Sequence, residues 1–296
     1  MFKNKKFISR AWIFVVAAVI IAGSSAGMAF ALNNSVPEEG PAGEIAPYAT
    51  GAAADIQAQT SKAGITAEYT VIDFSKQGLN PEQSNALREK LSLIKDITPQ
   101  QIEEKYKDII ANMIPGAKDI SAEQAAVYAA DIVKKVFEVD FTGYTAEARF
   151  SRSPVPNSDS WTVVFHETQE PPNAKQYIAS VNSINGTMVN ASSYTLNFRE
   201  DDFVVEISRD LENPEWMDKA EQAARKLMPE SVAITGSRVV FSAPETGVTV
   251  VCNLSDGSAY AVRLAGENKD VAACLYFPDG YDGSLDKKPA SENGVG

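Results

Sequence analysis

Histidine and cysteine are scarce in this chain of 296 residues, which has one histidine, His166, and two cysteines, Cys252 and Cys274. A Ser-His-Asp or Cys-His hydrolase would have to use His166 as its base. The chain also lacks the Gly-x-Ser-x-Gly pattern of a nucleophile elbow and the His-Glu-x-x-His pattern of a zinc protease. Two cysteines and a single histidine argue against a structural zinc site. We therefore expect a protein that is not an enzyme, with no catalytic residue, no cofactor and no bound metal.

Acidic residues are missing from the N-terminal end. The first ten residues contain four basic residues and no acid, and residues 11–32 contain no charge at all. A basic segment followed by an apolar one predicts that residues 1–32 are either a cleaved signal peptide or a single transmembrane anchor. Ala29-Phe30-Ala31 matches a small-x-small cleavage pattern, and cleavage after Ala31 would release the protein. In both cases we expect the bulk of the chain to be extracytoplasmic, either single-pass at the cell membrane or secreted.

Basic residues are outnumbered in the rest of the chain. The sequence has 27 basic and 39 acidic residues, and its formal net charge is −12. Without the four bases of residues 1–32, 23 bases face 39 acids, which is a net charge of about −16. A surface this acidic disfavours nucleic acid and anionic lipid head groups. The acids are dispersed, which is typical of a solvated surface, and a hydrophobic content of 44% indicates a packed core.

The region before residue 121 divides into a linker and a short folded segment. Residues 33–62 are rich in alanine, glycine, proline and serine, which predicts a flexible tether. For residues 63–120 the pattern predicts three elements: a strand over Ile65–Phe74, a helix from Asn80-Pro81 to about Ile94, and a helix that begins at Thr98-Pro99 and ends at Pro115-Gly116.

An internal repeat begins at residue 121. The string Ala-Glu-Gln-Ala-Ala occurs at Ala122–Ala126 and again at Ala220–Ala224, each time near the start of an amphipathic helix. Ser121 is the predicted N-cap of the first helix, which runs to about Phe137. The second helix opens at Asn213-Pro214 and ends near Met228.

Four strand-like runs follow each helix. They are Tyr144–Arg152, Trp161–Glu167, Gln176–Val181 and Thr187–Tyr194 after the first helix, and Val232–Ser242, Val248–Leu254, Ser258–Leu264 and Val271–Phe277 after the second. Asn185-Gly186 and Asp256-Gly257 occupy equivalent hairpin turns. The sequence thus predicts an α+β fold in which a helix and an antiparallel meander form each of two modules, residues 121–199 and 200–282. Residues 283–296 are polar and predict a disordered tail.

Three segments of the first module resemble the PepSY-type domain of bacterial envelope proteins. They are the helix Ser121–Phe137, the strand Trp161-Thr-Val-Val-Phe165, and the stretch Tyr177–Asn182 that leads into Asn185-Gly186-Thr187-Met188-Val189. The family pattern has an acidic residue where this chain has Asn182, and a threonine where it has Asn185. The resemblance covers about residues 121–194, is degenerate in the second module, and does not extend to residues 33–120. It implies cystatin-like α+β modules that bind or restrain peptidases and other envelope proteins, and it supplies no catalytic residues.

The leader, the repeat and the resemblance together predict a non-enzymatic extracytoplasmic binding protein. We expect its partner to be another envelope protein, such as a peptidase or a wall enzyme, and its contact surface to be an exposed sheet face or edge strand. Two alternatives stay open from the sequence: an envelope hydrolase that uses clustered carboxylates, and a structural assembly subunit. The carboxylates for a hydrolase would come from Glu167, Glu170, Glu200, Asp201 and Asp202, but nothing in the sequence sets two of them at the required separation.

His166 and an acidic cluster near the C-terminus are candidate site residues, but their positions are also typical of ordinary surface residues. His166 alternates with Trp161, Val163 and Phe165, so it lies on the more exposed face of its strand if the tryptophan faces the core. The acidic cluster near the C-terminus lacks the Asp-x-Asp-x-Asp-Gly spacing of calcium loops, so we expect a solvated turn; its members are Asp279, Asp282 and Asp286.

The aromatic and sulfur-containing candidates favour the core. Trp161, Phe165 and Tyr177 could form a ligand platform, but alternating positions on a sheet are typical of core or cross-strand pairs. Cys252 and Cys274 fall on strands of one meander. If those two strands are the first and third of three neighbours, their backbones are roughly 9–10 Å apart. That separation is too long for a disulfide, so we favour two buried thiols over a bridge.

Overall fold

The computed structural model describes residues 68–168, 174–195 and 207–286, all within one compact unit that spans residues 60–296. The predicted leader and linker lie outside these residues, and so do Glu170, Glu200, Asp201 and Asp202. Among the described helices, none combines the length and the apolar character that crossing a bilayer requires.

The described chain is mixed α+β. In chain order its elements are β1 Thr70–Asp73, α3 Phe74–Gln77, α4 Pro81–Ser92, α5 Pro99–Ala111, α6 Ala122–Phe137, β2 Tyr144–Ser151, β3 Ser160–Glu167, β4 Lys175–Asn182, β5 Met188–Thr195, α7 Glu215–Leu227, β6 Ile234–Ala243, β7 Gly247–Leu254, β8 Ala259–Ala265 and β9 Asp270–Phe277. The helices and meander strands predicted from the sequence are present with small shifts at their ends. This agreement follows from their strong local signals, since caps, turns and apolar periodicity depend on neighbouring residues.

One sheet contains all nine strands of the described residues, in the order β1-β2-β3-β4-β5-β9-β8-β7-β6. Each helix-meander unit supplies four consecutive strands, and the units meet at their last strands. There β5 pairs antiparallel with β9, with Ala191 opposite Cys274. Apart from β1, the order is therefore symmetric about the β5–β9 pair, as expected if the sequence repeat is also a structural one. Antiparallel pairing joins the two meanders into a continuous sheet that the sequence pattern alone did not predict.

Helix α6 begins at a complete capping box. The Ser121 side chain accepts a hydrogen bond from the Gln124 backbone N–H, and the Gln124 side chain accepts one from the Ser121 N–H. Alanines on the buried face, including Ala125 and Ala129, let α6 lie close against β1 to β5. Helix α7 covers β6, β7 and β8 and also contacts α6, so both helices cover the same face of the sheet.

The other face of the second meander is covered by the chain that follows β9. Tyr281 and Leu285 pack on an apolar cluster that includes Val251 and Ala261. Residues 283–286, predicted as the start of a disordered tail, are therefore part of the folded unit. Two apolar side chains and an ion pair at Asp286 hold this segment on the sheet, which the polar composition of the tail did not indicate.

The strand predicted over Ile65–Phe74 is shorter in the structure. It is described over Thr70–Asp73, where it pairs in parallel with β2, and residues 65–67 lie outside the described part of the chain. Asp73 ends the strand because its carboxylate accepts hydrogen bonds from the Ser75 N–H and hydroxyl, which caps α3 at Phe74.

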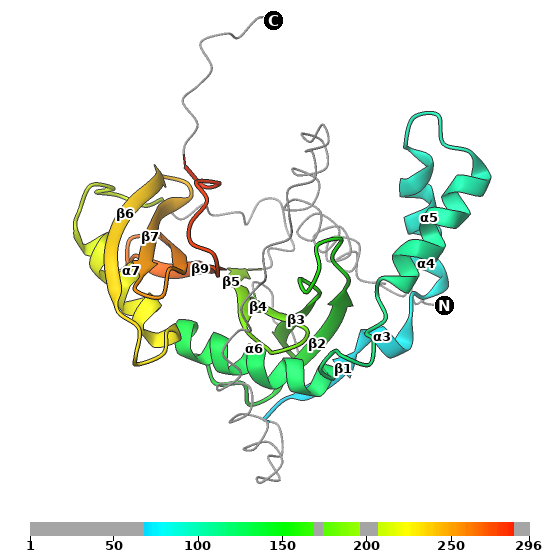
Figure 1. The fold of residues 1–296 in the computed structure, drawn as a ribbon, viewed down its shortest axis with the longest axis horizontal. Coiled ribbons are helices and arrows are strands. Elements are labelled where there is room, and N and C mark those ends of the chain that lie inside the picture. Colours follow the sequence, from blue (N-terminus) through cyan, green and yellow to red (C-terminus); the bar gives the residue numbers. More distant parts are fainter. Residues whose placement is uncertain (1–67, 169–173, 196–206, 287–296) are drawn as a thin grey trace, which may run out of the picture. The chain divides into compact units, whose positions relative to one another are not determined.

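Helices α4 and α5 form a hairpin that packs mainly on itself (Figure 1). Both start with a proline after a capping residue, Asn80 for α4 and Thr98 for α5, as the sequence predicted. The hairpin interior is small: Leu87 and Leu91 are its buried apolar residues on α4, and α5 has none. The large apolar side chains of α5 are only half-buried; they are Ile102, Tyr106, Ile109 and Ile110.

Candidate functional site

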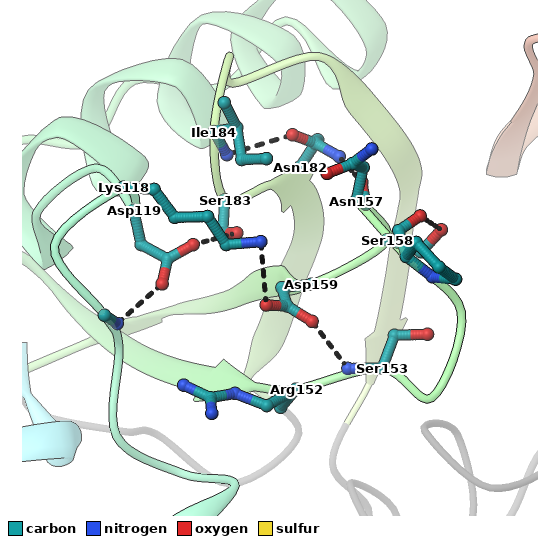
Figure 2. A network of polar contacts seen from close by, with 12 residues as sticks. Lys118, Asp119, Arg152, Ser153, Asn157, Ser158, Asp159, Asn182, Ser183 and Ile184 are labelled. Carbon is teal, nitrogen blue, oxygen red and sulfur yellow. Dashed lines mark hydrogen bonds and ion pairs between the residues drawn. The ribbon is translucent and has the colours of Figure 1, made fainter. Parts of the chain in front are cut away.

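Three segments meet at one end of the first meander, and we call them together the loop surface. They are residues 113–120 before α6, residues 152–159 between β2 and β3, and residues 182–187 between β4 and β5 (Figure 2). Both hairpin connections lie at the same end because their strands are antiparallel neighbours in the sheet. The first segment joins them through the Ile120 N–H, which donates to the Ser183 carbonyl over 2.7 Å.

Two carboxylates tie these segments together. Asp119 accepts a 2.6 Å hydrogen bond from the Ser183 hydroxyl on one oxygen and a 2.6 Å bond from the Gly116 N–H on the other (Figure 2). Asp159 is buried and accepts a 2.8 Å hydrogen bond from the Ser153 N–H, while its second oxygen lies 3.8 Å from Lys118 Nζ. A carboxylate that accepts several hydrogen bonds inside a loop fixes the backbone around it, because each unpaired N–H there would cost free energy.

The Asn182 side chain organises the β4–β5 turn. Its carbonyl oxygen accepts hydrogen bonds from the N–H groups of Ile184 and Asn185 at 2.9 and 3.3 Å. Its amide nitrogen donates to the Asn157 carbonyl at 2.8 Å, which joins the turn to the β2–β3 connection (Figure 2). An acidic residue at this position would accept in the turn but would not donate to Asn157, so asparagine serves both loops.

The loop surface presents apolar and basic side chains to solvent. Ile114, Val155 and Ile184 are 52%, 58% and 37% exposed, one from each segment. The exposed cations are Lys118 and Arg152, and Arg152 donates to the Ile114 carbonyl over 3.2 Å. The two carboxylates are engaged with the loops, so the outer contacts of this surface would be made mainly by apolar groups and cations. This combination is typical of protein contact surfaces, where apolar patches have polar rims.

His166 belongs to a different cluster, on the face of the first meander that α6 does not cover. The predicted orientation is confirmed, because Trp161, Val163 and Phe165 are fully buried on the helix side. His166 Nε2 lies 3.4 Å from a Glu147 oxygen, and Nδ1 lies 3.2 Å from the Glu167 carbonyl.

Glu147 is the central acid of this cluster. It also pairs with Arg149 at 2.8 Å, and the Arg149 guanidinium stacks over the Phe74 ring at 4.3 Å. Burial acts to raise the pKa of Glu147, but the hydrogen bond from His166 and the charge of Arg149 outweigh it and hold that pKa below its usual range.

Two of the three C-terminal acids, Asp282 and Asp286, have structural partners. Asp286 pairs with the Arg238 guanidinium at 3.2 and 3.3 Å and accepts from the Tyr281 hydroxyl at 3.2 Å. Asp282 accepts from the Ser284 N–H at 2.9 Å, as a turn-capping residue does. In the described part of the chain no three histidine, cysteine or acidic side chains come together as a metal site.

The aromatic and cysteine candidates are in the core, as predicted. Trp161 and Phe165 are fully buried and Tyr177 is nearly so. Trp161 Nε1 donates to the Ile120 carbonyl over 3.0 Å, so this tryptophan also bonds the first segment of the loop surface to the core. Cys252 and Cys274 are buried free thiols on β7 and β9, with β8 between them.

The sequence reasoning missed Asp119, Asp159 and Ser183. Each lies in an irregular segment where polar residues are common, and their partners are distant in sequence. One signal in the sequence pointed to this region: Asn182 stands where the family pattern has an acidic residue. That signal marks the β4–β5 hairpin, but it does not indicate the two segments that contact the hairpin. Side chains that join separate loops leave no periodic pattern.

Comparisons with protein-family models, with curated proteins and with solved structures found no match for this chain. The resemblance to PepSY-type modules therefore stays a prediction. Function has to be argued from the loop surface itself and from the exposed strand edges.

Proposed function

We propose that this protein is a non-enzymatic binding module of the cell envelope that holds a partner protein against its loop surface. The observation behind the proposal is the set of three hydrogen-bonded segments that present Ile114, Val155 and Ile184 to solvent. Rigid loops lose little conformational entropy on binding, and exposed apolar residues with adjacent cations provide contact area and orientation. Tethering or export through residues 1–32 is part of the same proposal.

We infer that the partner is an envelope peptidase or wall enzyme. Three loops held together by hydrogen bonds could insert into the concave active-site cleft of an enzyme. Such clefts are lined mainly by apolar side chains, which would contact the apolar side chains of the loops. The hydrogen bonds that Asp119 and Asp159 make would also hold the segments in shape against cleavage, because a protease needs an extended, mobile chain.

The edge strand β6 is the competing contact surface. It is ten residues long and lies at one edge of the sheet, where it could pair with a partner strand. Two irregularities interrupt its pairing with β7, and Arg238 is exposed on it. Bulges and charges on an edge are features that discourage strand addition, so we favour the loop surface.

Site-specific photocrosslinking in intact cells tests the proposal. A photoreactive residue at Val155 on the loop surface is compared with one at Val239 on β6, which is similarly exposed at 42%. We expect one dominant envelope protein to be captured from position 155 and little from position 239. Capture from position 239 alone would place the contact on the edge strand, and capture from neither position would contradict the binding function.

A second experiment separates an inhibitor from a scaffold. The captured enzyme is assayed with the full protein and with the Val155→Asp, Ile184→Asp variant, which leaves Asp119 and Asp159 unchanged. We expect the parent protein to change the enzyme's activity and the variant to change it at least several-fold less. Equal effects of both proteins would show that the loop surface is not the contact.

A further inference from the structure

The end of the α4–α5 hairpin presents two adjacent apolar side chains to solvent. Leu93 is 81% exposed and Ile94 is 46% exposed, although both follow the buried Leu91 on α4. We call residues 92–98, which connect α4 to α5, the hairpin tip. Leu93 is more exposed than any other large apolar residue in the described ranges.

The tip has a defined backbone. The N–H groups of Leu93 and Ile94 donate to the Lys90 and Leu91 carbonyls at 3.2 and 3.1 Å, and the Ile97 N–H donates to Ile94 at 3.4 Å. Thr98 then caps α5 through the Gln101 N–H. The exposed pair is therefore held outward by a hydrogen-bonded turn and is not part of an extended loop.

Side-chain contacts join the two helices of the hairpin. Arg88 bonds Glu103 at 2.6 Å and stacks on the Tyr106 ring at 3.7 Å, and the Tyr106 hydroxyl donates to Ser84 at 3.0 Å. These contacts join α4 to α5, while in the described residues neither helix packs broadly on the meanders. A self-contained hairpin can therefore support a contact at its end without disturbing the rest of the fold.

Charge distinguishes the hairpin from the second meander but not from the first. Residues 79–116 contain five basic and six acidic residues, residues 117–168 and 174–195 together contain six and eight, and residues 207–286 contain seven and 13. Lys90 and Lys95 flank the two apolar side chains. An anionic bilayer would therefore repel the hairpin less than it repels the second meander, and lysine stems can extend toward head groups beside inserted apolar residues.

The chain that precedes the described residues indicates which surface is within reach. Residues 1–32 have the pattern of a membrane segment, and about 35 residues connect them to residue 68. As a flexible chain, a segment of that length would have a root-mean-square span of about 30–35 Å. If residues 1–32 are retained as an anchor, the folded unit would lie at a typical distance of that order from the bilayer.

We propose that the hairpin tip contacts the lipid surface of the membrane that anchors the chain, with Leu93 and Ile94 inserted among the head groups. This inference rests on the proposed membrane anchor and is independent of what binds the loop surface. Two apolar side chains give weak affinity alone, but the tether supplies a high local concentration of bilayer, so a weak contact becomes populated. The contact would orient the sheet relative to the membrane.

An environment-sensitive fluorophore on the full-length protein tests this inference. Leu93→Cys is labelled under native conditions, where the buried Cys252 and Cys274 are inaccessible, and the protein is reconstituted in vesicles of phosphatidylethanolamine and phosphatidylglycerol. We expect a blue-shifted emission that doxyl-labelled lipid quenches. The control is Val155→Cys, which is 58% exposed and should show neither effect.

The outcomes separate the anchor from the tip. In one outcome the protein co-sediments with vesicles, but the label at position 93 shows neither a blue shift nor lipid quenching. That result would overturn the tip contact and leave the anchor intact. Protein that does not associate with vesicles would overturn both. A blue shift that grows with protein density and resists lipid quenching would show contact between two copies, which also overturns the proposal.

A label-free measurement complements the fluorophore. Trypsin cleavage after Lys90 and Lys95 should be several-fold slower for the vesicle-bound parent than for the vesicle-bound Leu93→Ser, Ile94→Ser variant. Both side chains are exposed, so the variant should fold normally. Equal cleavage rates in the two proteins would count against insertion of the tip.

Discussion

The Ser183 hydroxyl donates a 2.6 Å hydrogen bond to Asp119, although 64 positions of sequence separate the two residues. The bond joins the β4–β5 turn to the segment that enters α6, and the Ser183 N–H extends the connection by donating to the Asp159 carbonyl over 2.9 Å. Ser183 is fully buried, so the donor of each bond is shielded from bulk water. One small polar residue therefore determines how the three segments of the loop surface meet.

Ser183→Ala should destabilise the protein by about 1.5–3 kcal/mol, because it removes a hydrogen bond to a carboxylate and adds no bulk. The free energy of unfolding, measured with a chemical denaturant, checks this. Ser158→Ala is the matched control, since the Ser158 hydroxyl is exposed and makes one long bond of 3.4 Å, to the Pro156 carbonyl. We expect the control to stay within about 0.5 kcal/mol of the parent. A Ser183 variant as stable as the control would show that Asp119 finds another donor.

Gly186 and Gly257 occupy equivalent hairpin turns of the two meanders, and both have a positive φ, +70° and +91°. A Cβ at Gly186 would lie 2.5 Å from the Tyr128 ring, whereas a Cβ at Gly257 would meet nothing within 4 Å. Gly257→Ala should therefore lower the free energy of unfolding by about 1–2 kcal/mol, because alanine is strained in a left-handed conformation. Gly186→Ala should cost about 1–3 kcal/mol more, because Tyr128 and α6 must shift. Equal losses in denaturant unfolding would mean that Tyr128 moves away freely.

Acid should weaken the sheet at Glu147. Its pKa in the folded protein is below the ordinary value of 4.5, because the hydrogen bond from His166 and the charge of Arg149 outweigh the opposing effect of burial. The ionised carboxylate therefore contributes stability above about pH 4.5, and that contribution is lost as the pH falls through the lower folded value.

Unfolding of the parent and of Glu147→Gln at several pH values between about 3 and 7 measures this contribution. The variant should be less stable near neutral pH and should lose less stability on acidification. Glu89→Gln, at an exposed position of α4, controls for the loss of one carboxylate. Parallel pH profiles for the parent and Glu147→Gln would contradict the expectation.

Both thiols should be unreactive in the folded protein. Burial raises the pKa of Cys274 to about 12, and it also raises the pKa of Cys252, so the reactive thiolate is scarce at neutral pH. An aromatic disulfide reagent should detect neither thiol before unfolding and both after addition of guanidinium. Rapid reaction of the native protein would show that β7 or β9 opens. Absence of both thiols after unfolding would show that they are bridged.

Much of the fold was predictable because its signals are local. The capping boxes at Asn80, Thr98 and Ser121 each involve residues three positions apart, and the two hairpin turns depend on an Asn-Gly or Asp-Gly pair. Alternation along β3 was enough to assign Trp161 and Phe165 to the core. Apart from the short helix α3, the sequence by itself thus determined which of the described segments are helices and strands, and it identified the buried face of β3.

The tertiary structure decided how these elements combine. The antiparallel pairing of Ala191 with Cys274 joins two meanders into one sheet, and no local signal distinguishes this partner strand from another exposed edge. The loop surface likewise needs Asp119, Asp159 and Ser183 to meet from three separate segments. A strand edge or a short polar side chain can form hydrogen bonds with many different partners. Which partner it has in the folded protein depends on which groups the packing of helices and strands brings within hydrogen-bond distance.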